Sequence, residues 1–344
     1  MKYMDGRMFQ IGKVLCVMSL VMSLAISTTA LVPPVAFGQD AIRFPEGFIS
    51  LSERQEFSPY FFAVDKKRRI LRVYENEGGL PKILLESPSD MGKKDGDKSK
   101  ENDRRTPVGI YFLQSKLAPP EIPFNLYGKM AFTTDYPNVF DRRDDKTGSG
   151  IWLHAVPDFV ALTRGSRGCV VVRNDVIEKL EKYVRLGQTP MVIFDEIAEV
   201  EPQEYLQERD RFLNFVETWR AAWQNEDVDT YIKFYDPTFA TKDMNYRQWY
   251  RHKRRLKGLY KSIEVTLSKP LIIHNRDQVV IRLLQSYRSD RHEDFGEKTI
   301  HARYSPETGF RIIREDWEIL PRPADWPTAV IPVRKAANTA PSTQ

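Results

Sequence analysis

Two residues in the middle of the chain have the types that acyl-transfer chemistry needs. They are Cys169 and, on its N-terminal side, His154. A thiol attacks a carbonyl as its thiolate, so a neighbouring imidazole or cation that lowers the thiol pKa would activate it. Arg164, Arg167 and Arg173 supply positive charge nearby. The pair predicts a cysteine nucleophile with a histidine base, and the alternative is a histidine and a thiol that are both simply buried in the core.

The backbone beside the cysteine is suited to the same chemistry. Gly168 gives the chain freedom to approach a substrate closely. The N–H groups of Gly168 and Cys169 are placed in the sequence to form an oxyanion hole, where one donor typically contributes about 2.7–4 kcal/mol to the catalysed rate. We therefore expect the turn before Cys169 to bind developing negative charge.

The start of the chain has the pattern of an export signal. Basic residues precede an apolar run over 14–35, and a small-x-small site follows at Ala36-Phe37-Gly38. Residues 1–38 are predicted to be a signal peptide, or alternatively an uncleaved membrane anchor. The chain has two cysteines, of which Cys16 lies in this segment, so the mature protein would keep Cys169 alone and form no internal disulfide. We expect an exported protein of the periplasm or cell envelope.

Short strands separated by turns surround the cysteine and the histidine. This pattern predicts a mainly β domain, in which a helix capped by Asn174 follows the cysteine strand. The expected strands are a hairpin over 60–74 and the segments 82–86, 108–113, 151–154, 169–172 and 191–194.

A second unit follows an acidic linker over 195–208. Helices are expected first, over 207–225 and 229–235, and the segment 246–259 then mixes aromatic with basic residues. Strands are expected afterwards, over 263–267, 271–274, 279–287, 298–304 and 310–319. Helices followed by an antiparallel sheet describe an α+β cone or sandwich. The tail over 321–344 is rich in Pro, Ala and Thr and is predicted to be disordered.

Composition and motifs exclude several other classes. A net charge of +5 suits an anionic polymer but is too small to indicate nucleic acid, and the basic run over 252–257 is interpreted as a solvated helix face. The five histidines show no metal-binding spacing, and no nucleotide-binding loop is present, so no metal and no cofactor are expected. Lys146-Thr147-Gly148 matches an element of penicillin-binding serine enzymes, but no Ser-x-x-Lys accompanies it, so we interpret it as a turn.

The segment Ser166-Arg167-Gly168-Cys169, with His154 before it, resembles the catalytic signature of YkuD-type L,D-transpeptidases. Further matching motifs precede it, and together they extend the resemblance over residues 57–195. They are Gly92, Gly96-Asp97-Lys98, Asp103-Arg104-Arg105-Thr106-Pro107-Val108-Gly109-Ile110-Tyr111, Tyr136-Pro137-Asn138 and Gly150-Ile151-Trp152-Leu153-His154.

By this resemblance Cys169 is the nucleophile, His154 is its base and the Ala155 carbonyl orients the imidazole. The fold it implies is an L,D-transpeptidase-like β-sandwich or barrel with one or two helices. Substrate binding is assigned to Ser166, Arg167, Arg173 and Trp152. The family's usual histidine before Gly-Cys is Arg167 here and its usual arginine two residues after the cysteine is Val171, a loss for which Arg173 is a possible replacement.

Residues 206–320 resemble NTF2-like domains through a Trp-rich first helix and a late Trp317. The combination resembles a subgroup of cell-shape enzymes that act on peptidoglycan stem peptides, some of which trim stems instead of cross-linking them. The resemblance implies an L,D-transpeptidase working through a Cys169 thioester. Two alternatives stay open: an L,D-carboxypeptidase that trims tetrapeptide to tripeptide stems, and a non-catalytic module that binds the cell wall.

Overall fold

The computed structural model describes residues 44–50, 57–76, 79–324 and 326. The predicted signal or anchor over 1–38 lies outside these residues, as does most of the predicted tail. Within the described part of the chain, no helix is long and apolar enough to cross a membrane. The first part is mainly β with few helices, as predicted, and the second part has helices followed by an antiparallel sheet, as also predicted.

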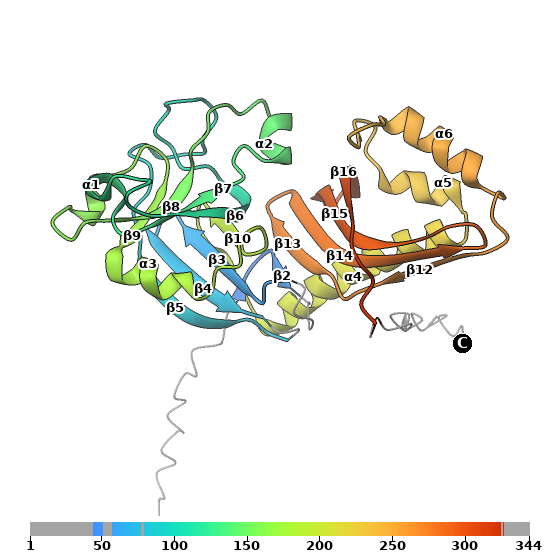
Figure 1. The fold of residues 1–344 in the computed structure, drawn as a ribbon, viewed down its shortest axis with the longest axis horizontal. Coiled ribbons are helices and arrows are strands. Elements are labelled where there is room, and N and C mark those ends of the chain that lie inside the picture. The colour runs from blue at the N-terminus through green and yellow to red at the C-terminus, as the bar shows by residue number, and fades with distance from the viewer. Residues whose placement is uncertain (1–43, 51–56, 77–78, 325, 327–344) are drawn as a thin grey trace, which may run out of the picture. The chain divides into compact units, whose positions relative to one another are not determined.

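The first part of the chain builds one eight-stranded sheet (Figure 1). Its strand order is β5-β4-β3-β10-β6-β7-β8-β9, and two neighbouring pairs, β3 with β10 and β8 with β9, run parallel. All six predicted strand segments are present, and Ala131–Thr134 is a strand that the sequence analysis missed. The strands are β3 Tyr60–Asp65, β4 Ile70–Glu75, β5 Lys82–Pro88, β6 Gly109–Leu117, β7 Ala131–Thr134, β8 Trp152–Val156, β9 Val170–Arg173 and β10 Pro190–Phe194.

Short helices fill the connections of this sheet. They are α1 Phe124–Tyr127, α2 Val139–Arg143, the 3-10 turn η1 Leu162–Arg164 and α3 Asn174–Glu181. The predicted helix after the cysteine strand is therefore present, but its cap differs from the prediction. Asn174 is the first helical residue, and its side chain accepts the Lys129 N–H at 2.9 Å instead of capping the helix.

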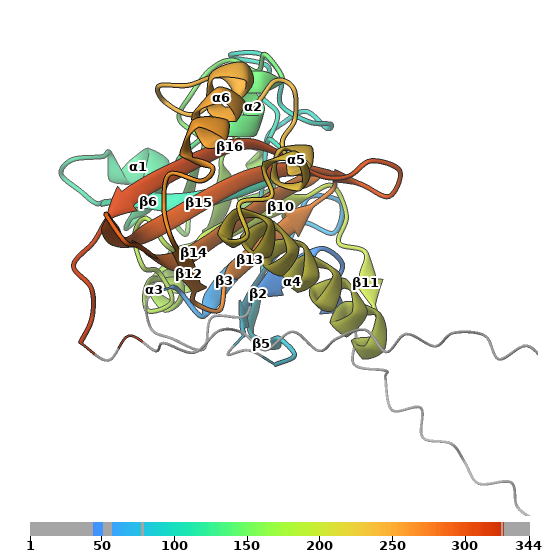
Figure 2. The ribbon, with the colours of Figure 1, turned by 90° about the vertical axis from the view of Figure 1, so that its right-hand side faces the viewer.

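The second part of the chain packs helices against one antiparallel sheet. Figures 1 and 2 show α4 lying along one face of this sheet, and its apolar side forms a core with the strands. The helices are α4 Pro202–Gln224, α5 Val228–Tyr231, η2 Ile232–Phe234 and α6 Tyr246–Leu256. The strands are β12 Ile263–Leu267, β13 Leu271–Asn275, β14 Gln278–Ser289, β15 Glu293–Ser305 and β16 Gly309–Ile319.

The segment predicted as a linker, 195–208, is largely structured. Its strand β11, Glu199–Val200, pairs with β1, Phe44–Pro45, and α4 already begins at Pro202. Proline suits the first turn of a helix because the N–H it lacks would have no partner there. Pro202 therefore favours the early start of α4, inside the segment that was predicted to be an acidic linker.

A shared apolar core joins the two parts. Strands β3, β6 and β10 contribute buried residues such as Phe61, Ile110 and Val192, and the second sheet contributes Ile273 and Val280, among others. Strand β2, Phe48–Ser50, comes before the first sheet in the chain but pairs with β13 of the second sheet. The two sheets therefore belong to one packed body.

The beginning of the tail packs on the second sheet. Arg322 contacts the side chains of Glu293 and Ser286, and the Trp326 ring meets the Phe295 ring edge to face at 4.8 Å. The prediction of disorder therefore does not hold for these residues, because an aromatic ring and a guanidinium group find partners on the sheet.

The shared core makes a stability prediction. Ile273 is completely buried in it, so Ile273→Ala should lower the free energy of unfolding by about 2–5 kcal/mol. Ile319→Ala is the matched control, because Ile319 is 74% exposed and should change that value by less than about 0.5 kcal/mol. Urea unfolding followed by circular dichroism measures both. Equal effects would contradict the assignment of a common core.

Candidate functional site

The parallel strands β8 and β9 place His154 and Cys169 on one face of the sheet. His154 pairs with Val171 and Leu153 pairs with Val170, so continuing the register one step sets Cys169 beside Trp152. Alternate residues of a strand share a face. The other face, which carries Leu153 and Val170, is fully buried in the core. The two predicted chemical groups therefore lie on the same side, with the pair Leu153–Val170 between them.

The imidazole of His154 is held in one tautomer. Its Nδ1 lies 2.7 Å from the Ala155 carbonyl, which can only accept, so Nδ1 carries the proton and Nε2 is left basic. The Tyr127 ring meets the imidazole edge to face at 5.0 Å. Burial lowers the pKa of His154 to about 4, against the opposing effect of the Ala155 carbonyl. The imidazole is therefore neutral and able to take a proton at neutral pH.

Cys169 is partly exposed as a residue, while burial of its sulfur disfavours ionisation of the thiol. Its Sγ lies 3.4 Å from the Gly150 carbonyl, to which the S–H can donate. Burial of the sulfur raises the pKa of Cys169 to about 11, although the Trp152 N–H and the charge of Lys98 act in the opposite direction. The expectation of a thiolate favoured by imidazole and arginines therefore stays a prediction: burial opposes ionisation of the thiol, and the charge that favours the thiolate comes from Lys98.

Hydrogen bonds of Ser166 shape the turn before the cysteine. The Ser166 Oγ donates to the Cys169 carbonyl at 2.7 Å and accepts the Gly168 N–H at 3.0 Å. The Gly168 N–H, expected in the oxyanion hole, is thus occupied, which leaves the Cys169 N–H as the candidate donor. Gly168 has φ +135°, and a Cβ there would lie 2.8 Å from the Arg105 carbonyl, so only glycine fits.

The residues expected to bind substrate differ in their exposure and in the hydrogen bonds they already make. Arg167 is exposed, with one weak hydrogen bond to the Asn102 side chain at 3.3 Å. Trp152 is half-buried, and its ring lies 5.1 Å from that of Tyr127. Arg173 donates to the Val160 carbonyl at 2.6 Å and so holds the loop between β8 and β9. Arg167 is the most accessible cation of the set.

The sequence analysis missed residues that come to this site from distant segments. Tyr127 of α1 is one, and burial together with the nearby Cys169 raises its pKa. Lys98 is another: it is buried, and its ammonium donates to Asp103 at 2.9 Å and to the Lys100 carbonyl at 3.0 Å. Lys98 was visible only as part of the Gly-Asp-Lys motif, and no local pattern marks Tyr127.

Buried charge pairs brace the loop that carries Lys98. The Lys146 ammonium lies 2.9 Å from Asp97 and 3.2 Å from Asp141, which is fully buried. Asp97 in turn accepts the Val108 N–H at 2.7 Å. Lys146 of the Lys-Thr-Gly tripeptide thus has a structural role in ion pairs, and the tripeptide itself follows a turn at 144–145 instead of forming one. Among the described residues, no three His, Cys, Asp or Glu side chains gather as metal ligands.

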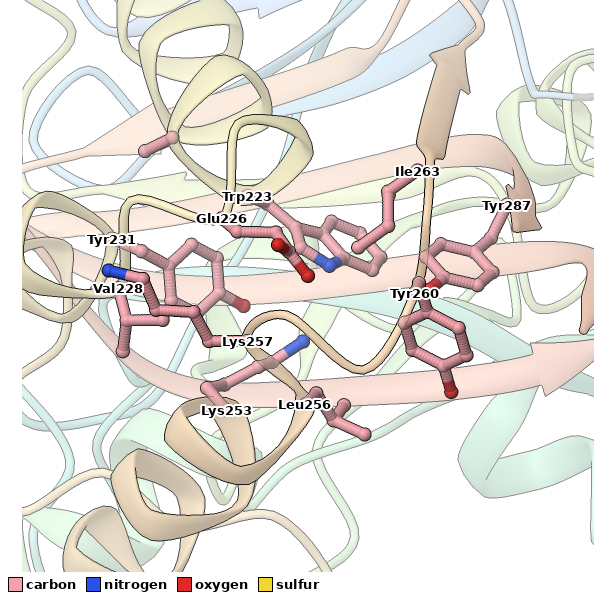
Figure 3. Close-up of a pocket in the computed structure, with 11 residues that line it drawn as sticks. Trp223, Glu226, Val228, Tyr231, Lys253, Leu256, Lys257, Tyr260, Ile263 and Tyr287 are labelled. Atoms are coloured by element: carbon pink, nitrogen blue, oxygen red, sulfur yellow. The ribbon is translucent and has the colours of Figure 1, made fainter. Parts of the chain in front are cut away.

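The second domain contains two adjoining hollows that share Trp223 and Lys253. Figure 3 shows the smaller one, whose lining is mostly apolar, with Lys253 at its edge. The larger, of about 560 Å³, also receives Gln285, Asp294 and Lys298. In the described part of the chain, the Gln285 Oε1 and Asp294 Oδ1 atoms are buried without a hydrogen-bond partner.

Lys253 is unusual among the residues of the larger pocket. Its ammonium lies 4.4 Å from the centre of the Trp223 ring and 4.5 Å from that of Trp249. No hydrogen bond or ion pair of this group occurs within the described residues. Burial and the charge of Lys298 lower the pKa of Lys253 to about 7. The pocket therefore contains the Lys253 amine, which has no hydrogen-bond or ion-pair partner among the described residues. It also contains two acceptor oxygens without a hydrogen bond, those of Gln285 and Asp294.

Comparisons with known proteins agree on a two-domain organisation. The family of L,D-transpeptidase catalytic domains (YkuD) matches residues 59–193, and the Cds6 C-terminal NTF2-like domain family matches residues 211–316. No curated protein sequence matches the chain.

Solved structures extend the likeness over both domains. Bd1075 of Bdellovibrio bacteriovorus is 49% identical, with a TM-score of 0.76, over 82% of this chain and 100% of its own. Pgp2 of Campylobacter jejuni, described as a helical cell shape determining protein, is 26% identical, with a TM-score of 0.62, over 80% of this chain and 94% of its own.

The un-ionised thiol predicts slow alkylation at neutral pH. With a pKa of about 11, Cys169 should react with iodoacetamide more slowly than free cysteine (pKa about 8.5), and its rate should rise about tenfold per pH unit up to about pH 10. The measurement is the mass-resolved labelling rate of the Cys169 peptide from pH 6 to 11. The unfolded chain, which should behave as free cysteine, is the control, and a plateau reached below pH 8 would indicate a preformed thiolate–imidazolium pair instead.

Proposed function

The chain belongs to the family of proteins that join an L,D-transpeptidase catalytic domain to a C-terminal NTF2-like domain, and we propose that it is an exported enzyme that breaks and re-forms stem-peptide bonds of peptidoglycan through Cys169. The observation that carries this proposal is the pairing of β8 with β9. It supports the proposal because it puts Cys169, a partly exposed residue, on the same face of the sheet as an imidazole whose Nδ1 bonds the Ala155 carbonyl, so that Nε2 can act as a base.

Catalysis begins from two neutral groups. As the sulfur attacks the carbonyl of the stem-peptide bond, the Nε2 atom of His154 takes the thiol proton, so thiolate and imidazolium form only during the reaction. The Cys169 N–H donates to the developing oxyanion, and the positive charge of Lys98 favours the anionic stage. The imidazolium then protonates the departing amine, which leaves an acyl group on sulfur as a thioester.

The group that accepts the acyl chain from the thioester determines the product. An amine from a neighbouring stem gives an L,D-cross-link, which is the transpeptidase reaction that we propose first. Water gives a shortened stem, which is the carboxypeptidase alternative. Arg167 is placed to pair with a substrate carboxylate, because it is exposed and lies two residues before the nucleophile. An enzyme of this substrate class works in the cell envelope, which agrees with the export signal predicted over 1–38.

Removal of either reacting group should stop the reaction. Cys169→Ala should show no turnover, and His154→Ala should lower kcat by about 10²–10⁴-fold, the usual contribution of a general base. The measurement is incubation with purified tetrapeptide muropeptides and identification of the products by mass, as dimers or as tripeptides. Lys179→Ala, on the exposed side of α3, is the control and should retain full activity. Activity of Cys169→Ala would reject the mechanism.

A second candidate function is binding of the cell wall by the NTF2-like domain. It is favoured by the larger pocket, where the Lys253 amine and the free oxygens of Gln285 and Asp294 point to a ligand that has both a carboxylate and N–H or O–H groups. Stem peptides have both. In this alternative the pocket gives the protein its function, with or without chemistry at Cys169.

Binding and turnover can be separated with a pocket variant. Lys253→Met keeps the length and apolar contacts of the side chain but removes the amine, so binding to insoluble peptidoglycan should fall about 10- to 100-fold. The kcat/KM on soluble muropeptides should stay within about twofold. Lys233→Met, at an exposed position, is the control in the same pull-down titration. Unchanged wall binding by Lys253→Met would exclude the pocket.

A further inference from the structure

A segment from outside the catalytic motif lies along the chain on both sides of Cys169. After the cysteine, Asp90 and Val171 exchange two backbone hydrogen bonds, of 2.7 and 2.8 Å. Before it, the Ser166 N–H donates to the Met91 carbonyl at 2.7 Å and the Lys93 N–H donates to the Ser166 carbonyl at 3.0 Å. Residues 90–93 therefore form a template to which the nucleophile turn is attached.

The side chain of Asp90 adds a further tie to this template. It is 2% exposed, and both carboxylate oxygens have partners. Oδ2 accepts the Gly165 N–H at 2.6 Å, while Oδ1 accepts the Met91 N–H at 2.9 Å and pairs with the guanidinium of Arg69. Gly165 has φ +76°, and a Cβ there would lie 2.6 Å from the Lys93 side chain, so the close approach of loop and template requires glycine.

Hydrogen bonds within the turn connect Gly165 to Cys169. Gly165 is followed directly by Ser166, whose hydroxyl bonds both the Cys169 carbonyl and the Gly168 N–H. A shift of Gly165 therefore moves the residue that determines the shape of the turn. A second side-chain tie of this loop, from Arg173 to the Val160 carbonyl, lies at the far end of the loop.

We propose that Asp90 is a positioning residue, which fixes the Cys169 turn against residues 90–93 and so sets the direction from which the sulfur meets the substrate and His154. It touches neither substrate nor sulfur and acts through Gly165 and Ser166. The kinetic part of this inference rests on the proposed function, whereas its geometric part does not.

Loss of the Asp90 carboxylate should lower the rate of turnover and raise the rate at which Cys169 is labelled. Asp90→Ala should lower kcat about 10- to 100-fold with KM within about threefold, since a misplacement of about 1 Å is enough to cause such losses. At the same time the loosened turn should expose the sulfur, so that iodoacetamide labels Cys169 at least about threefold faster at pH 8. Unfolding would also speed labelling, because the unfolded thiol behaves as free cysteine, so the labelling rates are compared only at temperatures where thermal unfolding shows each variant to be folded.

Two further variants separate positioning from folding. Asp90→Asn keeps the size of the side chain but retains one acceptor oxygen where two N–H groups donate, so it should show both effects in a weaker form. Arg69→Met removes the ion pair without touching the loop and should stay within about twofold of wild type in both measurements. Thermal unfolding of each variant establishes that the protein is folded at the assay temperature, and Asp90→Asn decides the question where Asp90→Ala does not fold.

The two assays also separate this inference from the proposed function. Labelling rates of Asp90→Ala and Asp90→Asn within twofold of Arg69→Met would overturn the positioning role. If the wild-type protein turned over no stem peptide, the proposed function would fail, but the labelling comparison would still decide whether Asp90 holds the turn.

Discussion

The parallel pairing of β8 with β9 is the constraint on which the candidate active site depends. Two parallel strands need a crossover connection, and here residues 157–169 form it without a full helix, because they contain only the short turn η1. The same residues carry the turn that presents Cys169. A crossover with so little internal hydrogen bonding has to be held from outside, which explains why Ser166, Gly165 and Val160 all bond to residues beyond it.

Burial that creates the geometry also determines the chemistry. Packing of β8 orders the His154 ring, and the same loss of water lowers its pKa and raises that of Cys169. A thiolate–imidazolium pair in this position would require desolvation of two ions. The pKa shifts of both residues therefore favour the neutral thiol and the neutral imidazole. In the proposed mechanism the rate gain comes from groups that stabilise charge as it forms, namely the Cys169 N–H and the ammonium of Lys98, which bonds to Asp103.

Much of the fold could be predicted from local sequence, because β-rich runs between turn residues leave few alternatives. The strands around His154 and Cys169 and the long helix with Trp219 and Trp223 were of this kind. The linker was misread because a strand as short as β11 is defined by its partner β1 and not by its own residues. Tyr127 and Asp90 were missed for the same reason: each acquires its place through contacts with segments far away in the chain.

The second sheet packs against the first through an apolar face. The face of β13 and β14 that does not meet α4 is apolar, as Ile273, Val280 and Leu284 show, and the first sheet presents Phe61, Ile110 and Val192 to the same core. An NTF2-like domain with such a face would expose apolar surface if it stood alone. Strand β2 reinforces the arrangement, because chain that precedes the catalytic domain completes the edge of the second sheet at β13. The two domains therefore depend on each other for burial, so the pocket around Lys253 and the turn of Cys169 belong to one folding unit and not to separable modules.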